Sequence, residues 1–99
     1  MKNIIDKLNK SFENRIRLGI MSSLMVNCEI DFLSLKEWLD VTDGNLASHI
    51  AALEKEEYII VKKGFEGKKT KTTYSITKLG KTAFTNHLKA LENLIKNNK

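Results

Sequence analysis

Residues 34–57 of the chain read SLKEWLDVTDGNLASHIAALEKEE, and this stretch decides the fold. It opens with a capping-box pattern at Ser34, which predicts the start of a short helix over residues 35–41. Turn-forming residues follow at 42–44 and can cap the next helix. A longer helix over residues 45–57 is predicted by apolar residues with helical spacing, namely Leu46, Ile50 and Leu53. Two helices around a tight turn are the arrangement of a helix-turn-helix.

Upstream of this stretch, apolar residues again follow one face of a helix. They predict a helix over residues 12–26, preceded by a helical arm over residues 1–11. A short extended piece is expected around Ile30, just before the helix of residues 35–41. That short helix is expected to bury Leu35, Trp38 and Leu39.

Downstream, the apolar period changes from helical to that of strands. Residues 58–61 and 70–77 are rich in β-branched and aromatic residues and flank a segment that contains glycines, which predicts a β-hairpin. A long helix follows from Lys78. The element order therefore predicts a winged helix-turn-helix: a mainly helical α+β domain with a three-helix core and a two-stranded β wing. We expect one domain over residues 1–99, in which residues 1–11 form the arm, 12–77 the core and 78–99 a dimerisation helix.

The basic charge of the chain is concentrated in one segment. The 17 Lys and Arg and 12 Asp and Glu residues give a net charge of +5. Between Lys62 and Lys81 lie seven lysines and only one acidic residue, Glu66, which leaves the rest of the chain slightly acidic. Such a block is typical of a surface that binds phosphates, although a solvated surface that keeps a protein soluble has the same composition.

Several classes of protein are disfavoured by the composition. The chain has a single cysteine, Cys28, and contains no nucleotide-binding glycine motif and no spacing typical of a metal site or a catalytic triad. We therefore expect no enzyme, no catalytic residue, no metal and no cofactor. Cys28 is interpreted as a small hydrophobic residue, and a redox sensor is the alternative. No apolar run reaches the length of a membrane span, so a cytoplasmic protein without a membrane partner is expected.

The predicted DNA-binding residues come from two elements. Base-reading residues are expected at the polar leading end of the helix over residues 45–57 and just before it, namely Thr42, Asn45, Ser48 and His49. Contacts to the DNA backbone are expected from Lys62, Lys63, Lys68, Lys69, Lys71, Thr72, Arg15 and Arg17. For the two arginines, an ion pair with an acidic neighbour such as Glu13 is an alternative.

The N-terminal arm and the last helix each carry an apolar face that a compact winged helix has little core left to cover. We therefore expect a homodimer, whose twofold symmetry suits two DNA half-sites. The alternative is that the apolar seam of the last helix packs on the first helix of its own chain. The expected interface residues are Ile4, Ile5, Leu8, Phe84, Leu88, Leu91 and Ile95. An alternative function is a winged-helix protein-interaction module that binds an acidic partner.

The sequence also resembles the small stand-alone winged-helix regulators related to the MarR and ArsR families. The resemblance rests on TDGNLASHIAALE at residues 42–54 and on FEGKKTKT at residues 65–72, and it covers about residues 14–91. It implies dimeric DNA-binding regulators of transcription, with Asn45, Ser48 and His49 at recognition-helix positions. Thr70 stands where many relatives have proline. The thiolate metal motif of metal-sensing ArsR members is absent, whereas a small-molecule effector is compatible with the MarR resemblance.

Overall fold

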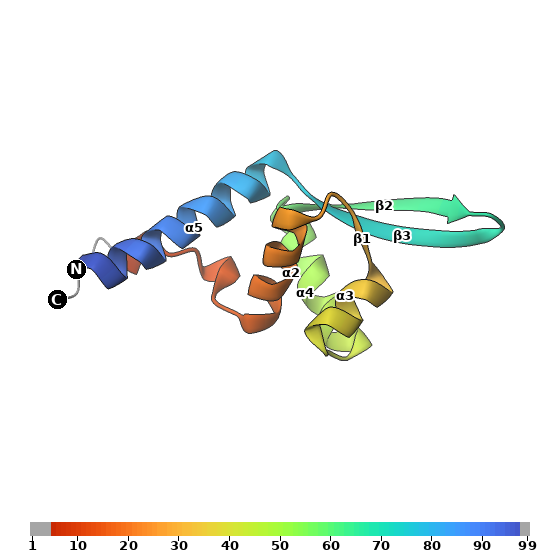
Figure 1. Cartoon of the computed structure of the whole chain (residues 1–99), viewed down its shortest axis with the longest axis horizontal. Helices are drawn as coiled ribbons and strands as arrows, with labels where there is room; N and C mark the ends of the chain where they lie inside the picture. The colour runs from red at the N-terminus through yellow and green to blue at the C-terminus, as the bar shows by residue number, and fades with distance from the viewer. Residues whose placement is uncertain (1–4, 98–99) are drawn as a thin grey trace.

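A computed structural model describes residues 5–97 and has the predicted winged-helix fold (Figure 1). Its elements in chain order are η1 (Lys10–Phe12), α2 (Arg15–Val26), β1 (Ile30–Asp31), α3 (Phe32–Leu39), α4 (Asp43–Lys55), β2 (Ile59–Glu66), β3 (Lys69–Ile76) and α5 (Lys78–Asn97). The three strands form one antiparallel sheet in the order β1-β3-β2. The outer part of β2 and β3 extends beyond the helices as the wing, and α5 extends away from the body on the other side (Figure 1).

The core lies between α2, α3, α4 and the base of the sheet. The apolar spacing along α4 is confirmed, because Leu46, Ile50 and Leu53 are its buried residues. The largest fully buried side chains are Phe12, Ile20, Met21, Leu24, Leu35, Leu46, Leu53 and Ile59. Each contributes about 1.5–3 kcal/mol relative to an exposed position, so this cluster holds the three helices together.

The start of α3 differs from the predicted capping box. The N-cap is Asp31, whose carboxylate accepts the backbone N–H of Ser34 at 2.8 Å, so the predicted cap at Ser34 is wrong. Asp31 has the extended backbone that an N-cap needs, whereas Ser34 lies inside the first turn. Hydrogen bonds from Ser34 lower the pKa of Asp31, which keeps the cap ionised.

Trp38, which was expected in the core, is on the surface. Trp38 is 60% exposed, because the inward side of α3 is occupied by Phe32, Leu35 and Leu39. Trp38 lies about a quarter turn beside that line. Cys28 is also exposed, in the connection between α2 and β1.

The end of α4 fixes the direction of the wing. The N–H of Tyr58 donates to the carbonyl of Leu53 (3.0 Å) and that of Glu57 to the carbonyl of Glu54 (2.9 Å), the two bonds of a Schellman motif. Glu57 takes the left-handed conformation that this motif requires, with φ 63°. The chain therefore turns sharply out of α4 into β2.

The segment that joins β3 to α5 is attached to the turn between α4 and β2. The backbone N–H of Thr77 donates to the carbonyl of Tyr58 (3.0 Å), and its hydroxyl donates to the carbonyl of Glu57 (2.7 Å). The Thr77 hydroxyl also accepts the N–H of Gly80 (2.8 Å). Gly80 packs so closely that a Cβ there would overlap the carbonyl oxygen of Tyr58. We call this set of contacts the junction.

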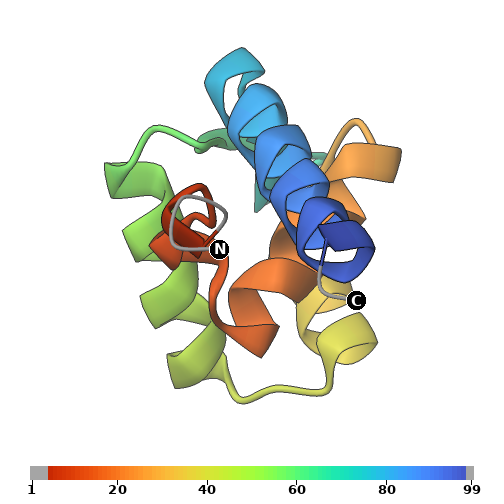
Figure 2. The ribbon, with the colours of Figure 1, turned by 90° about the vertical axis from the view of Figure 1, so that its left-hand side faces the viewer.

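The N-terminal segment packs along α5, as the end-on view shows (Figure 2). Phe12 lies edge-to-face against Phe84, with ring centroids 5.2 Å apart, and also contacts the ring of His87. The N–H of Asn9 donates to Nδ1 of His87 (2.9 Å), and burial lowers the pKa of this histidine. Phe84 is only 2% exposed and so belongs to the core of the protomer.

We predict that Gly80→Ala destabilises the fold by about 1–3 kcal/mol, because the added methyl group meets backbone that cannot yield. Gly44→Ala is the matched control: nothing lies within 4 Å of its Cβ position, and alanine favours the helix by up to about 1 kcal/mol. Urea unfolding of both variants measures the difference. Equal stability of the two variants would contradict the role of the junction.

Candidate nucleic-acid interface

The leading end of α4 is an exposed surface of small and polar side chains. Thr42 is its N-cap, with a hydroxyl oxygen that accepts the N–H of Asn45 at 3.2 Å. Asn45 and Ser48 are exposed, as are the alanines Ala47 and Ala51. An ion pair between Lys36 and Asp43 (2.9 Å) links α3 to this turn. The helix is therefore slim at the end where its hydrogen-bonding groups lie.

His49 on α4 pairs with Arg17 on α2. It is half-buried, and its Nδ1 accepts a hydrogen bond from Nε of Arg17 at 3.0 Å. Both residues were predicted to contact DNA, but Arg17 was expected to meet phosphate or an acidic neighbour. The pairing was missed because the two residues are 32 positions apart and neither helix pattern predicts it.

This contact determines the hydrogen-bonding character of His49. An arginine guanidinium only donates, so Nδ1 must be unprotonated and the proton of the neutral ring lies on Nε2. Burial, and then the charge of Arg17, lower the pKa of His49, which favours the same neutral form. The other ring nitrogen of His49, Nε2, therefore carries a hydrogen and acts as a hydrogen-bond donor.

The wing carries the predicted lysines on exposed positions. Lys62 and Lys63 lie on β2, Lys69 and Lys71 on β3, and Lys68 in the two-residue turn between the strands. Gly67, the first residue of that turn, has φ +66°, as a type II′ turn requires. The hairpin thus places five cationic side chains within one narrow ribbon.

The strand register divides the wing into two faces. Residues that pair across β2 and β3 share a face, and neighbours along a strand alternate. The face that we call the Phe65 face carries Lys63, Phe65, Thr70 and Thr72. The opposite face, which we call the Lys71 face, carries Lys62, Glu66, Lys69, Lys71 and Thr73.

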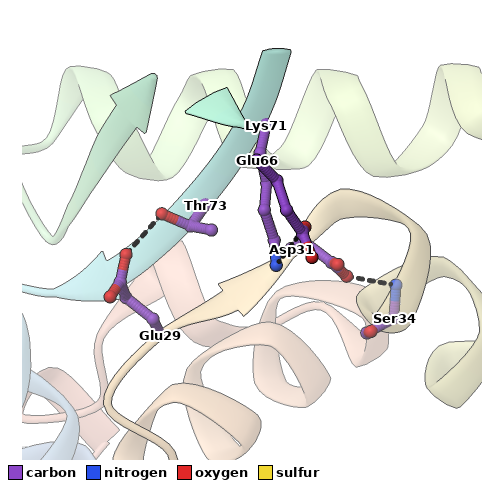
Figure 3. Close-up of polar contacts among 6 residues, drawn as sticks. All are labelled: Glu29, Asp31, Ser34, Glu66, Lys71 and Thr73. Carbon is purple, nitrogen blue, oxygen red and sulfur yellow. Dashed lines mark hydrogen bonds and ion pairs between the residues drawn. The ribbon is translucent and has the colours of Figure 1, made fainter. Parts of the chain in front are cut away.

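The Lys71 face is rich in carboxylates (Figure 3). Lys71 forms an ion pair with Glu66 at 3.1 Å, which raises the pKa of its ammonium group. β1 pairs with β3 and brings Asp31 opposite Thr73, and Thr73 donates to Glu29 at 2.6 Å. Charge counted along the sequence missed Glu29 and Asp31, because they reach the wing only through this strand pairing.

The remaining predicted residues are placed as follows. Arg15 is exposed at the first position of α2. Ile5, Leu88, Leu91 and Ile95 are exposed by 58, 44, 37 and 79%, and Leu8 is half-buried. Ile4 lies outside the described residues.

Two negative findings apply to the described part of the chain. Residues 5–97 contain no group of three or more His, Cys, Asp or Glu side chains that could hold a metal ion. Within the same range, no helix combines the length and the apolar character needed to cross a bilayer.

The chain is similar to known regulators over most of its length. A family described as "Winged helix DNA-binding domain" matches residues 16–95. An uncharacterised protein of Methanocaldococcus jannaschii is 36% identical over an alignment of 90 residues that covers 89% of this chain and 96% of that protein. The structure of a transcriptional regulator homologue from Pyrococcus horikoshii superposes with a TM-score of 0.86 at 30% identity, covering 97% of this chain and 93% of that one.

A more distant neighbour is NadR, whose structure is a complex with 4-hydroxyphenylacetate. It has a TM-score of 0.73 at 17% identity, with 97% of this chain and 67% of that chain covered, so it shows the fold alone. The family and the fold are those of DNA-binding transcriptional regulators and not those of enzymes. The resemblance noted in the sequence is thereby confirmed.

We predict that replacing Arg17 with methionine raises the pKa of His49 towards 6.5 and removes its fixed tautomer. In the intact protein His49 binds a proton more weakly than in the unfolded chain. Its contribution to stability is therefore present above pH 6.5 and is lost as the pH falls.

Nitrogen-15 NMR of the histidine rings measures both properties. His87 is the internal control, because its partner is the N–H of Asn9 and Arg17→Met leaves that contact in place. A proton on Nδ1 of His49 in the intact protein would contradict the pairing.

Proposed function

Because the chain belongs to the winged helix DNA-binding domain family, we propose that it is a homodimeric transcriptional regulator that binds double-stranded DNA at specific sequences. In this proposal α4 lies in the major groove and the wing lies on the backbone or in the minor groove. The observation that carries the proposal is that the slim polar end of α4 and the lysine-rich wing belong to one packed unit, joined at the junction.

Base edges are read by the exposed end of α4. Asn45 offers an amide that can bond adenine at two positions, and Ser48 a hydroxyl that can donate or accept. His49 acts as a donor through Nε2–H, which suits acceptors such as guanine O6 or a purine N7. Thr42 lies next to them, although its hydroxyl oxygen already caps the helix.

Phosphates are held mainly by lysines that have no ion pair among the described residues, namely Lys62, Lys63, Lys68 and Lys69. Thr72 and the arginines Arg15 and Arg17 add donors. Lys71 contacts a phosphate only after it leaves Glu66. Since exposed ion pairs contribute at most about 1 kcal/mol, that exchange costs little.

The dimer forms through the outer stripe of α5 and the N-terminal segment. Leu88, Leu91 and Ile95 recur with heptad spacing and leave an apolar stripe exposed on an isolated protomer. Ile5 and Leu8 lie on the N-terminal segment that packs along α5 (Figure 2). Phe84 has no part in this interface, because it fills the protomer core.

A small-molecule effector and a cytoplasmic location remain predictions. NadR is bound to 4-hydroxyphenylacetate in its structure, and at 17% identity this neighbour supports the fold alone.

We predict that the wild-type protein binds a fluorescent random-sequence duplex with an affinity that falls steeply with salt. Between about 50 and 200 mM salt, six or more phosphate contacts lower affinity by about 10³-fold or more. Lys68→Ala with Lys69→Ala weakens binding to all sequences and reduces the log–log salt slope by about 0.9 per lost contact. Fluorescence anisotropy measures both effects.

The matched control removes two charges far from the wing, through Lys89→Ala and Lys96→Ala on α5, and leaves the slope unchanged. Ser48→Ala instead changes the preference between sequences, by about 1–3 kcal/mol per base contact. No binding at low salt would disprove the proposed function and direct attention to an acidic protein partner.

We predict that Leu88→Asp with Ile95→Asp converts the dimer to single chains of 11.3 kDa, because the charges would be buried at the interface. Leu79→Asp is the control, since Leu79 is 53% exposed on the same helix but lies off the stripe. Sedimentation measures the masses. A wild-type protein that sediments as a single chain would refute the dimer.

A further inference from the structure

Phe65 is an exposed aromatic residue on the outer part of the wing. Its side chain is 78% exposed, one residue before the end of β2. The other large apolar side chain exposed on the described wing strands is Ile60, near the base, at 55%. An aromatic ring held in water at the end of a lysine-rich ribbon has no role in the packing of the protomer.

The Phe65 face continues the side of the sheet that covers the helices. Phe65 pairs with Thr70, and Lys63 with Thr72. One step closer to the body on the same face lies Tyr74, which is 7% exposed and belongs to the core. In Figure 1, α3 and α4 lie on one side of the wing. A duplex that lies along α4 therefore meets this face.

The distribution of charge on the wing also favours the Phe65 face as the surface that meets DNA. None of the four residues of the Phe65 face is acidic, and Lys63 is a cation. The Lys71 face holds Glu66, with Asp31 and Glu29 beside it (Figure 3). These three carboxylates offset the three lysines of the Lys71 face, whereas no carboxylate offsets Lys63, so a polyanion meets more net positive charge on the Phe65 face.

We infer that the wing meets the minor groove with its Phe65 face and that Phe65 enters between base pairs as an apolar wedge. Lys63 and the hydroxyls of Thr70 and Thr72 then lie against the flanking phosphates. Apolar side chains that enter the minor groove partly unstack a base step and kink the duplex. The inference rests on the proposed function and adds a residue that the sequence analysis did not select.

A wedge of this kind predicts where the wing prefers to bind. Phenylalanine makes no hydrogen bond to a base edge. Its preference between DNA sequences therefore depends on the free energy needed to unstack each base step. Pyrimidine–purine steps such as TA unstack most easily. The wing therefore favours such a step beside the sequence that α4 reads.

The test uses a duplex of about 30 base pairs, selected from a random pool with the wild-type protein and long enough for two half-sites. 2-Aminopurine is placed at successive positions beside the half-site, because its fluorescence rises when it is unstacked. We expect wild-type protein to raise this fluorescence at one step beside each half-site. Phe65→Ala loses that rise and about tenfold or more in affinity, as expected when one stacking contact is removed.

Two further variants separate a wedge from a general effect of the wing surface. Phe65→Leu keeps an apolar wedge and retains much of the affinity. Ile60→Ala removes an exposed apolar side chain from the opposite face and leaves affinity and fluorescence at the wild-type values.

Three outcomes would overturn the inference. A Phe65→Ala variant with wild-type affinity and fluorescence would refute the wedge alone, while DNA binding stands. A change in sedimentation mass without a change in DNA binding would assign Phe65 to a contact between proteins. If the selection yields no duplex at all, the proposed function fails together with the inference.

Discussion

The junction sets the relative positions of α4, the wing and α5. Four element ends meet there: the end of α4, the start of β2, the end of β3 and the start of α5. The left-handed Glu57 turns the chain out of α4, and Thr77 attaches the end of the hairpin to the carbonyl groups of Glu57 and Tyr58. Gly80 then allows α5 to start directly against Tyr58. The backbone contacts of the junction and the hydroxyl of Thr77 thus orient the wing relative to α4 and direct α5 away from both.

Strand pairing gives the wing a chemical polarity that its sequence does not show. Along the chain, residues 62–81 contain seven lysines and a single acidic residue, Glu66. In the sheet, alternation places Glu66 and Lys71 on one face, and β1 adds Asp31 to that face. The other face keeps a lysine, two threonines and an exposed phenylalanine, without a carboxylate. A polyanion therefore sees two different surfaces on one hairpin, and the proposed orientation on DNA follows from this difference.

Local patterns predicted the elements well where a single helix face or turn decides the outcome. The inward residues of α4 follow directly from its period, and Thr42 caps it as the turn residues indicated. The predictions were wrong where two nearby residues suit the same structural position equally well. Asp31 and Ser34 are both good N-caps, and the strand pairing of Ile30 and Asp31 with β3 decides in favour of Asp31. Trp38 fits the helical spacing of α3 within a quarter turn, but Phe32, Leu35 and Leu39 already fill that side of the core.

The fold class, the order of the elements, the exposed polar end of α4 and the basic hairpin could all be predicted from the amino-acid sequence. These depend on periodicity, turn chemistry and composition, which act between residues close together in the chain. Three features required the folded chain: Arg17 pairs with His49, Phe84 fills the protomer core with Phe12, and carboxylates from the α2–β1 connection and from β1 line one face of the wing. Each of these joins residues more than 30 positions apart, where packing and strand register, which no local pattern encodes, select the partner.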